Sequence, residues 1–203
     1  MRLYRFEFST NVERVTLALA HKGLEVESVW VDPDDRTPVV LVSGQRLVPV
    51  LEHDAHIVFD STAILRYLED AFPDPPLYPR DDAKRAEMDV FIDWFNRVYK
   101  RPPNEIEAEL AKPEPDEERI AELSREMVTN LAVHEGLLAE RDYLLGDEFS
   151  AADCAAFPFL KYALKIDNGD DELFHRILHE RQPIAAYPRL RAWIERVDEL
   201  PRA

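Results

Sequence analysis

The sequence is poor in the features that would cross-link the chain or carry it into a membrane. Its 203 residues include a single cysteine, Cys154, so no disulfide can form within the chain. No apolar run approaches the roughly 20 residues of a membrane span, and the N-terminal residues lack the long apolar core of a signal peptide. These absences predict a cytoplasmic protein that does not insert into membranes.

Basic side chains are also scarce. The chain carries 25 Lys and Arg residues against 41 Asp and Glu residues, a formal net charge of −16. This charge repels phosphate backbones and anionic membrane surfaces, so we expect no nucleic acid and no membrane as partner. Of the six histidines, only His175 and His179 share the i, i+4 spacing of a metal-binding pair, and no HExxH motif or cysteine cluster accompanies them. We therefore expect no metal site, and interpret the histidines as part of a solvated helix face.

The chain does contain enough apolar sequence for a packed core, with 46% hydrophobic residues beside 33% charged ones. In residues 1–72 the hydrophobic pattern switches between the alternation typical of strands and the three-to-four-residue spacing typical of helices. It predicts the order β-α-β-(α)-β-β-α, with Ser61 as the N-cap of the last helix. Short right-handed connections then favour a four-stranded mixed sheet with helices on both faces.

A different pattern begins near residue 80. The segment FPDPPLYPR contains four prolines in nine residues, and we interpret residues 73–80 as a stiff linker. Helical periodicity then predicts an all-α domain over residues 81–203. Its first helix spans residues 83–100, and the Pro- and Glu-rich stretch 102–115 is expected to interrupt the helices. Further along, Ser150 and Asp153 have the spacing of a capping box, which predicts a helix start.

Three motifs in this order resemble the cytosolic glutathione transferases. They are VPVL followed by DSTAI, the stretch FSTNVERVTLALAHKGL, and YLLGDEFSAADCAAFPFL. The second is similar to the first turn and helix of the plant phi class, and the resemblance spans nearly the whole chain. It implies a thioredoxin-like βαβαββα domain followed by an all-helical domain, glutathione as co-substrate, a small electrophile as second substrate, and a homodimer.

Pro49 lies in a run that otherwise has the pattern of a strand, although proline cannot donate to the hydrogen-bond ladder. The resemblance implies that the Val48–Pro49 bond is cis, and that the backbone of Val48 pairs with the cysteine of glutathione as a short added strand. Asp60 and Ser61 follow at a helix N-terminus, which favours an anion. The γ-glutamyl carboxylate would bind there, with Asp60 as counter-charge for its ammonium. The alternatives are a proline bulge without a ligand and a serine that only caps its helix.

Ser9 is the expected catalytic residue. The first strand delivers it to the start of the next helix, where its hydroxyl could donate to the sulfur of glutathione and favour the thiolate. Asn11 is expected to orient this group. The same position suits a plain helix cap, and the sequence leaves both roles of Ser9 open. Tyr4 is a competing donor, but it lies within the strand, five residues before the turn.

The sequence departs from the family pattern before the Val-Pro pair. Many members place Lys or Gln directly before it to hold the glycyl carboxylate of glutathione, whereas here Leu47 occupies that position and Arg46 precedes it. We include Arg46 among the glutathione-binding residues and expect weaker or altered binding. The lack of a C-x-x-C motif disfavours disulfide chemistry, and Cys154 is expected to be a small core residue.

The second substrate is expected to meet an apolar wall formed by Phe8, Phe95 and Tyr99, although core packing is the alternative for aromatic residues of the helix over residues 83–100. Three functions fit these residues. The first is transfer of the glutathione thiolate to an electrophilic carbon in the cleft between the domains. The second is a non-catalytic module that binds glutathione or a protein partner, and the third is a glutathione-dependent isomerase or dehalogenase on the same fold.

Overall fold

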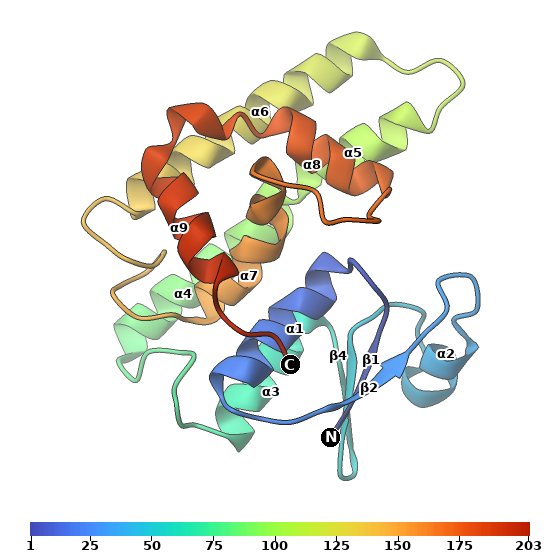
Figure 1. Cartoon of the computed structure of the whole chain (residues 1–203), viewed down its shortest axis with the longest axis vertical. Coiled ribbons are helices and arrows are strands. Elements are labelled where there is room, and N and C mark those ends of the chain that lie inside the picture. Colours follow the sequence, from blue (N-terminus) through green and yellow to red (C-terminus); the bar gives the residue numbers. More distant parts are fainter. The chain divides into compact units, whose positions relative to one another are not determined.

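The computed structural model describes all 203 residues and divides the chain into two compact units (Figure 1). The first contains residues 1–82 together with residues 200–203, and the second contains residues 83–199. The sequence had assigned residues 200–203 to the helical domain. The structure holds them in the first unit, where the N–H of Ala203 donates to the Thr16 carbonyl at 3.2 Å and Arg202 pairs with Glu13 at 3.1 Å.

The first unit is built on a four-stranded sheet with the order β2-β1-β3-β4. Its strands are β1 (Arg2–Arg5), β2 (Glu27–Trp30), β3 (Val50–His53) and β4 (His56–Phe59). β1 and β2 are parallel, and the other neighbouring pairs are antiparallel. The consecutive residues Val50 and Leu51 are both buried, as expected for a central strand covered on both faces. The predicted mixed sheet is therefore confirmed.

Three helices pack on this sheet: α1 (Thr10–His21), α2 (Thr37–Ser43) and α3 (Ser61–Ala71). In Figure 1, α1 and α3 lie on one face and α2 on the other. α1 buries Val12, Val15 and Leu19, which share one side of a helix because of their three- and four-residue spacing. α2 carries Pro38 in its first turn, where a missing N–H leaves no helical hydrogen bond unmade.

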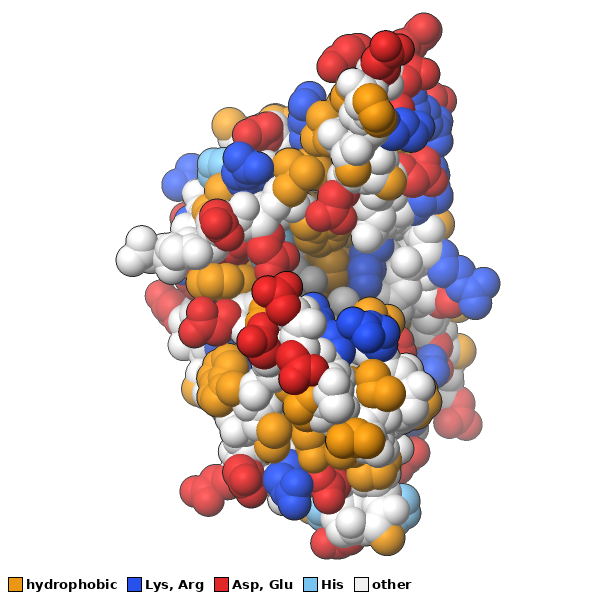
Figure 2. All heavy atoms as spheres, turned by 90° about the vertical axis from the view of Figure 1, so that its right-hand side faces the viewer, with side chains coloured by type: hydrophobic (Ala, Val, Ile, Leu, Met, Phe, Trp, Pro, Cys, Tyr) orange, Lys and Arg blue, Asp and Glu red, His pale blue; other side chains and the backbone are white.

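The side of the first unit that carries α2 exposes apolar side chains to solvent. Figure 2 shows hydrophobic side chains among charged ones on this side. Leu41 of α2 is 81% exposed, and Leu47 in the following loop is 74% exposed. Because residue 47 is a leucine, it offers no cation and no polar side chain at the position where the family pattern has Lys or Gln.

The proline-rich segment is packed onto α1 and α3 through a buried ion pair. Lys22 Nζ donates to Glu69 Oε2 at 2.9 Å and to the carbonyl oxygens of Phe72 and Pro75 at 2.6 and 2.9 Å. Glu69 also accepts the N–H of Leu77 at 2.8 Å. These bonds engage all three donors of the ammonium group, as burial requires. The segment predicted as a linker thus belongs to the first unit, where it buries Leu77 and Tyr78 and leaves its other residues at the surface.

The second unit is helical, as the sequence predicted. Its elements are α4 (Asp82–Trp94), the π-helical turn η1 (Phe95–Tyr99), α5 (Arg101–Leu110), α6 (Glu117–Leu137), α7 (Ala151–Leu160), η2 (Lys161–Ala163), α8 (Leu173–Arg181), η3 (Ile184–Ala186) and α9 (Pro188–Asp198). The stretch 102–115 was expected to interrupt the helices, but most of it forms α5. Pro102 and Pro103 lie in the first turn of α5, the one place in a helix where proline costs no hydrogen bond.

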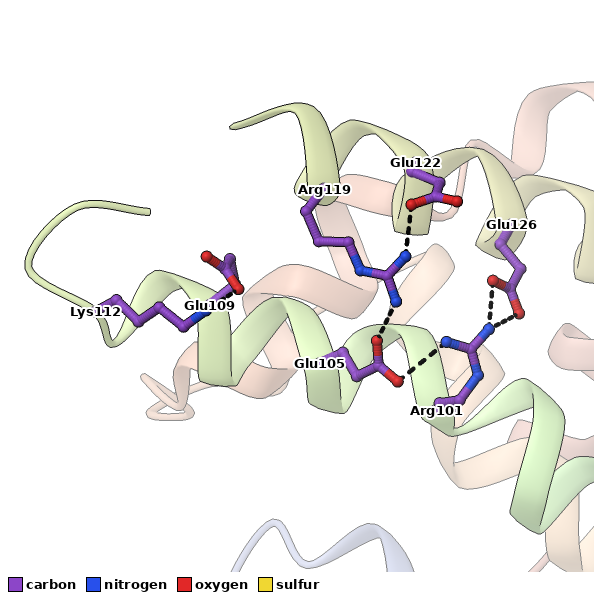
Figure 3. Close-up of polar contacts among 7 residues, drawn as sticks. All are labelled: Arg101, Glu105, Glu109, Lys112, Arg119, Glu122 and Glu126. Atoms are coloured by element: carbon purple, nitrogen blue, oxygen red, sulfur yellow. Dashed lines mark hydrogen bonds and ion pairs between the residues drawn. The ribbon is translucent and has the colours of Figure 1, made fainter. Parts of the chain in front are cut away.

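Charged side chains connect α5 to α6 in an alternating network (Figure 3). Arg101 pairs with Glu105 at 3.0 Å and with Glu126 at 2.5 Å, while Arg119 pairs with Glu105 at 2.6 Å and with Glu122 at 2.5 Å. The two arginines therefore share Glu105, and hydrogen bonds from both hold the pKa of this carboxyl below its usual range. All of these groups are partly open to solvent, so each pair contributes little by itself.

The start of α7 is built around one buried carboxylate. Asp153 Oδ2 accepts the N–H and the hydroxyl of Ser150 at 2.9 and 2.8 Å, and Oδ1 accepts the N–H of Leu144 at 3.0 Å and Nε1 of Trp193 at 2.9 Å. The predicted capping box is present. Because Asp153 also binds Leu144 and Trp193, the box connects α7 to the preceding loop and to α9.

Candidate functional site

Strand register brings the predicted binding segments to one edge of the sheet. Tyr4 of β1 is opposite Val50 of β3, which in turn is opposite Phe59 of β4. The chain therefore leaves β1, enters β3 and leaves β4 at the same edge. The segments attached there are the predicted ones: Phe8–Ser9, Val48–Pro49 and Asp60–Ser61. Since α1 and α3 begin from two of these segments, both helices start at this edge, which we call the Ser9 edge.

Ser9 is the N-cap of α1 and remains able to donate a hydrogen bond. Its Oγ accepts the N–H of Val12 at 3.3 Å. A hydroxyl has one proton and two lone pairs, and the cap uses a lone pair. The proton stays available to an acceptor outside the helix, so capping and donation are compatible at this residue. Phe8, directly before it, has a positive φ of 59° that turns the chain into the helix.

Tyr4 precedes Ser9 in the sequence and Asn11 follows it, but only Asn11 lies in the helix that Ser9 caps. The Tyr4 hydroxyl donates to Glu52 Oε2 at 3.1 Å and accepts from Arg2 at 3.4 Å. Arg2 and Glu52 are paired partners at the opposite end of β1 and β3, so the Tyr4 hydroxyl points away from the Ser9 edge. This geometry disfavours Tyr4 as the competing donor. Asn11 is half-buried in the first turn of α1.

The Val48–Pro49 peptide bond is cis, as the resemblance implied. Pairing between β1 and β3 runs from Val50 to Glu52, so Val48 precedes the ladder. The side chains of Val48 and Pro49 are buried. The sequence signal, a proline at the start of a β-run, thus located this feature correctly.

Asp60, and not Ser61 as predicted, is the N-cap of α3. Its Oδ1 accepts the N–H groups of Thr62 and Ala63, each at 3.0 Å. Asp60 has a φ of 69°, a conformation that costs a non-glycine residue of order 1–3 kcal/mol and is found at functional sites. Ser61 becomes the first residue of the helix, with only 4% of its surface exposed. The sequence could not decide between two adjacent residues that both favour the cap position.

Ser61 is in contact with a buried arginine that the sequence analysis missed. Arg14 of α1 is 1% exposed, and its Nη1 donates to Ser61 Oγ at 3.4 Å. Arginine stays protonated in proteins, so a positive charge lies behind the start of α3. The sequence signal is weak, a single Arg between Glu13 and Val15 in an otherwise ordinary amphipathic helix.

The loop before β3 places Arg46 at the surface and uses Gln45 for structure. Gln45 Nε2 donates to the Leu47 carbonyl at 2.8 Å, and its Oε1 accepts the Leu47 N–H at 2.5 Å. Arg46 is exposed. The pKa of Asp35 is lowered chiefly by hydrogen bonds from Thr37, with a smaller contribution from Arg46. Arg46 is therefore an exposed cation of this loop, close enough to Asp35 to contribute to the lowering of its pKa.

Two of the expected wall residues belong to the core of the second unit. Phe95 and Tyr99 are 0% and 2% exposed, and their rings stack with centroids 4.3 Å apart. His134 packs edge-on against both rings. Their burial corrects the expectation of an exposed aromatic wall, because neither ring has surface to offer. Phe8 is half-buried and keeps part of its ring at the surface.

The histidine assignment also needs correction. His134 is fully buried, and this burial lowers its pKa to about 4. His175 is buried as well, and its Nδ1 lies 2.7 Å from Asp170 Oδ2. The two were expected on a solvated face, but helical spacing alone does not tell which face is covered. No group of three His, Cys, Asp or Glu side chains is arranged to hold a metal ion, and no helix is long and apolar enough to cross a membrane.

Comparison with known proteins assigns a family. The sequence matches the family model for the glutathione S-transferase N-terminal domain over residues 3–76, and that for the C-terminal domain over residues 117–196. It is 30% identical over 161 residues to a glutathione S-transferase of Arabidopsis thaliana, covering 74% of this chain and 75% of the relative. The chain belongs to the glutathione S-transferase family.

Two further proteins are similar to this one over nearly the whole chain. The protein LigF of Sphingobium sp. is 29% identical over 242 residues, covering 99% of this chain and 90% of LigF. The crystal structure of the β-etherase LigF has a TM-score of 0.78, covering 98% of this chain and 95% of that one. A glutathione S-transferase from Rhodospirillum rubrum has a TM-score of 0.77 at 27% identity, covering 98% and 88%. The glutathione transferase fold is thus confirmed for both units.

Proposed function

We propose that the protein binds glutathione at the Ser9 edge of its sheet and transfers the thiolate to a small electrophile. The observation that carries this proposal is the convergence of the three predicted segments at the N-termini of α1 and α3. A helix N-terminus presents unpaired N–H groups and the positive end of the helix dipole. Two such termini at one edge suit a ligand with a carboxylate at one end and a thiolate in the middle.

Each part of glutathione has a proposed partner in the first unit. The backbone of Val48, just outside the β1–β3 ladder, pairs with the cysteine residue of glutathione as an added strand. Ser61 and the start of α3 bind the γ-glutamyl carboxylate, and Asp60 binds the ammonium. Only Oδ1 of Asp60 is used in the cap, so the carboxylate keeps an oxygen for the ligand. Arg46 is the candidate for the glycyl carboxylate, although its exposure predicts a weak contact.

Ser9 is proposed as the catalytic residue. Its hydroxyl proton donates to the sulfur of bound glutathione, and the N-terminus of α1 adds positive potential, so the thiolate is favoured over the thiol. Asn11, in the first turn of α1, is proposed to orient this group. The thiolate forms a C–S bond with the electrophilic carbon, and the leaving group departs with the electron pair of the bond that breaks. Phe8 is proposed as an apolar contact for the electrophile.

Cleavage of an ether bond is a second candidate for the same chemistry. It is supported by the similarity to the β-etherase LigF over nearly the whole of both chains. Attack of the thiolate on the carbon of a C–O bond forms the same C–S bond and releases the oxygen as an alkoxide or phenoxide. The two candidates thus share the glutathione site and differ in the leaving group. A glutathione-dependent isomerase or dehalogenase would also use this site.

Calorimetric titration with glutathione, followed by turnover assays with an aryl halide and with a β-aryl ether, tests this proposal. We expect saturable binding of glutathione and turnover of at least one of the two electrophiles. Binding without turnover of either would favour the non-catalytic module. Absence of binding would contradict the proposed site altogether.

We further propose that the protein is a homodimer in the cytoplasm. The support for a dimer is the family assignment together with the exposed apolar side chains of the first unit, which include Leu41 and Leu47. Sedimentation equilibrium tests this proposal, and a monomer at micromolar concentration would contradict it. The cytoplasmic location stays a prediction from the sequence.

A further inference from the structure

We propose that Arg14 is a positioning residue for the γ-glutamyl carboxylate of glutathione, acting through Ser61. This inference rests on the proposed function and assigns a role to a residue that lies below the binding surface. Arg14 is in α1, and Ser61 is the first residue of α3. The contact between Arg14 Nη1 and Ser61 Oγ, at 3.4 Å, therefore joins the helix that carries Ser9 to the helix that would bind the carboxylate.

The contact with Arg14 determines whether the Ser61 hydroxyl acts as a donor or as an acceptor toward a ligand. A guanidinium has donors and no acceptor, so it can bind only a lone pair of Ser61 Oγ. The single hydroxyl proton of Ser61 is then left for another acceptor. A carboxylate is such an acceptor, whereas a donor such as an ammonium is not. Arg14 thus makes Ser61 a donor toward the ligand, as the Val12 N–H does for Ser9.

The donors at the start of α3 are limited, which raises the importance of Ser61. The N–H groups of Thr62 and Ala63 already donate to Asp60 Oδ1. The donors that remain for an anion at the start of α3 are therefore the N–H and the hydroxyl of Ser61. A hydroxyl with a fixed donor direction is a better ligand for a carboxylate than one that rotates freely, because less freedom is lost on binding.

The positive charge of Arg14 is a second reason to expect a carboxylate at this helix start. Arg14 is 1% exposed and keeps its charge, so its field is screened less than that of exposed Arg46. A buried positive charge favours an anion nearby. It lies behind the N-terminus of α3, where the helix dipole has the same sign. Arg14 would thus favour ligands that carry the γ-glutamyl α-carboxylate over ligands that lack it.

The experiment compares glutathione with γ-aminobutyryl-cysteinyl-glycine, which lacks only that carboxylate. Calorimetry measures both ligands against the parent, Arg14→Met, Arg14→Lys and Ser61→Ala. We expect the parent to prefer glutathione by roughly 10- to 100-fold, the range of a charge-assisted hydrogen bond. Arg14→Met should lose most of this preference while its affinity for the decarboxylated ligand changes less than about threefold. Arg14→Lys, which keeps the charge, should retain part of the preference.

The double variant Arg14→Met, Ser61→Ala separates positioning from general support of the fold. If Arg14 acts through Ser61, adding Arg14→Met to Ser61→Ala should reduce the preference by much less than it does in the parent. A preference that survives Arg14→Met, or an equal loss of affinity for both ligands, would overturn the proposal. So would failure of Arg14→Met, Arg14→Lys and Arg14→Gln alike to fold by circular dichroism, because the role would then be structural. A parent that binds neither ligand would instead contradict the proposed function.

Discussion

Two serines at helix starts, one in each unit, use their hydroxyls in opposite ways. Ser9, at the start of α1, accepts the N–H of Val12 and keeps its proton for an outside acceptor. Ser150, at the start of α7, donates its proton to Asp153 at 2.8 Å and is buried. The same residue type at the same helical position thus keeps its proton for the proposed ligand in one unit and donates it to the fold in the other.

A second comparison concerns the buried charges beside Ser61, at the start of α3, and beside Ser150, at the start of α7. In the first unit the buried group next to Ser61 is the donor Arg14, which leaves a hydroxyl proton for a ligand. In the second unit the buried group is the acceptor Asp153, which accepts four donors from the protein itself. A buried cation at a helix start leaves that start open to an anion, whereas a buried carboxylate occupies it.

The largest expected effect concerns the second unit and is a loss of stability in acid. The pKa of His134 is about 4 when folded against 6.5 for an ordinary histidine, because burial disfavours the charged form. Below pH 6.5 the unfolded chain binds a proton that the folded chain does not bind until about pH 4. The free energy of unfolding should therefore fall by about 3 kcal/mol across this window, and by about 2 kcal/mol between pH 7 and pH 5.

Urea denaturation at pH 7 and pH 5 checks this contribution, with His134→Phe as the matched variant. Phenylalanine keeps an aromatic ring among Phe95 and Tyr99 but cannot be protonated. The drop in stability from pH 7 to pH 5 should be smaller in the variant by about 2 kcal/mol. An equal drop in parent and variant would show that other groups dominate the acid response.

Next in size is the effect of Ser61→Ala on the affinity for glutathione. Removal of a donor to a carboxylate should weaken binding by about 1.5–3 kcal/mol. Circular dichroism and thermal unfolding should show the fold intact, since Asp60 and not Ser61 caps α3. Calorimetric affinity equal to that of the parent would show that the carboxylate does not bind at this helix start.

Ser150→Ala is the matched control in the second unit. It removes a hydroxyl that donates to buried Asp153, and should lower the free energy of unfolding by about 0.5–2 kcal/mol. The glutathione affinity of the folded protein should be unchanged. Full stability in urea would argue that the N–H of Ser150 alone sustains the capping box.

The smallest effect is expected from the network between α5 and α6. Glu105→Gln removes the carboxylate that Arg101 and Arg119 share. Because these side chains are partly exposed, the variant should lose about 1 kcal/mol or less at low salt. The loss should shrink further at 1 M salt, where the screening length is about 3 Å. A larger loss that salt does not reduce would mean that packing, not charge, is responsible.

The sequence predicted the elements whose signals are local. Strand alternation, the proline at 49 and the capping box at Ser150 each depend on a few neighbouring residues, and the structure contains all three. The three predicted binding segments were identified separately. That they meet at one edge follows from strand register, since the turn between β3 and β4 and the crossover from β1 fix which ends align.

What the sequence missed depends on which face of a helix is covered. Arg14, Phe95 and Tyr99 have ordinary helical spacing, and only the neighbouring elements decide that all three are buried. For the same reason His134 was expected in solvent. The prolines at 102 and 103 were interpreted as breakers, although at a first turn they are compatible with a helix. Tertiary packing, absent from a local pattern, decides each of these cases.

The most direct test of the account is the ultraviolet titration of the thiolate of bound glutathione in the parent, Ser9→Ala and Ser150→Ala. A free thiol has a pKa of about 8.5, and a donor at a helix N-terminus should lower it to about 6.5. We expect this lowered pKa in the parent and in Ser150→Ala, and a return toward 8.5 in Ser9→Ala with affinity for glutathione kept within a few-fold. A bound thiol that titrates near 8.5 in the parent, or equally in the parent and Ser9→Ala, would contradict the catalytic role of Ser9.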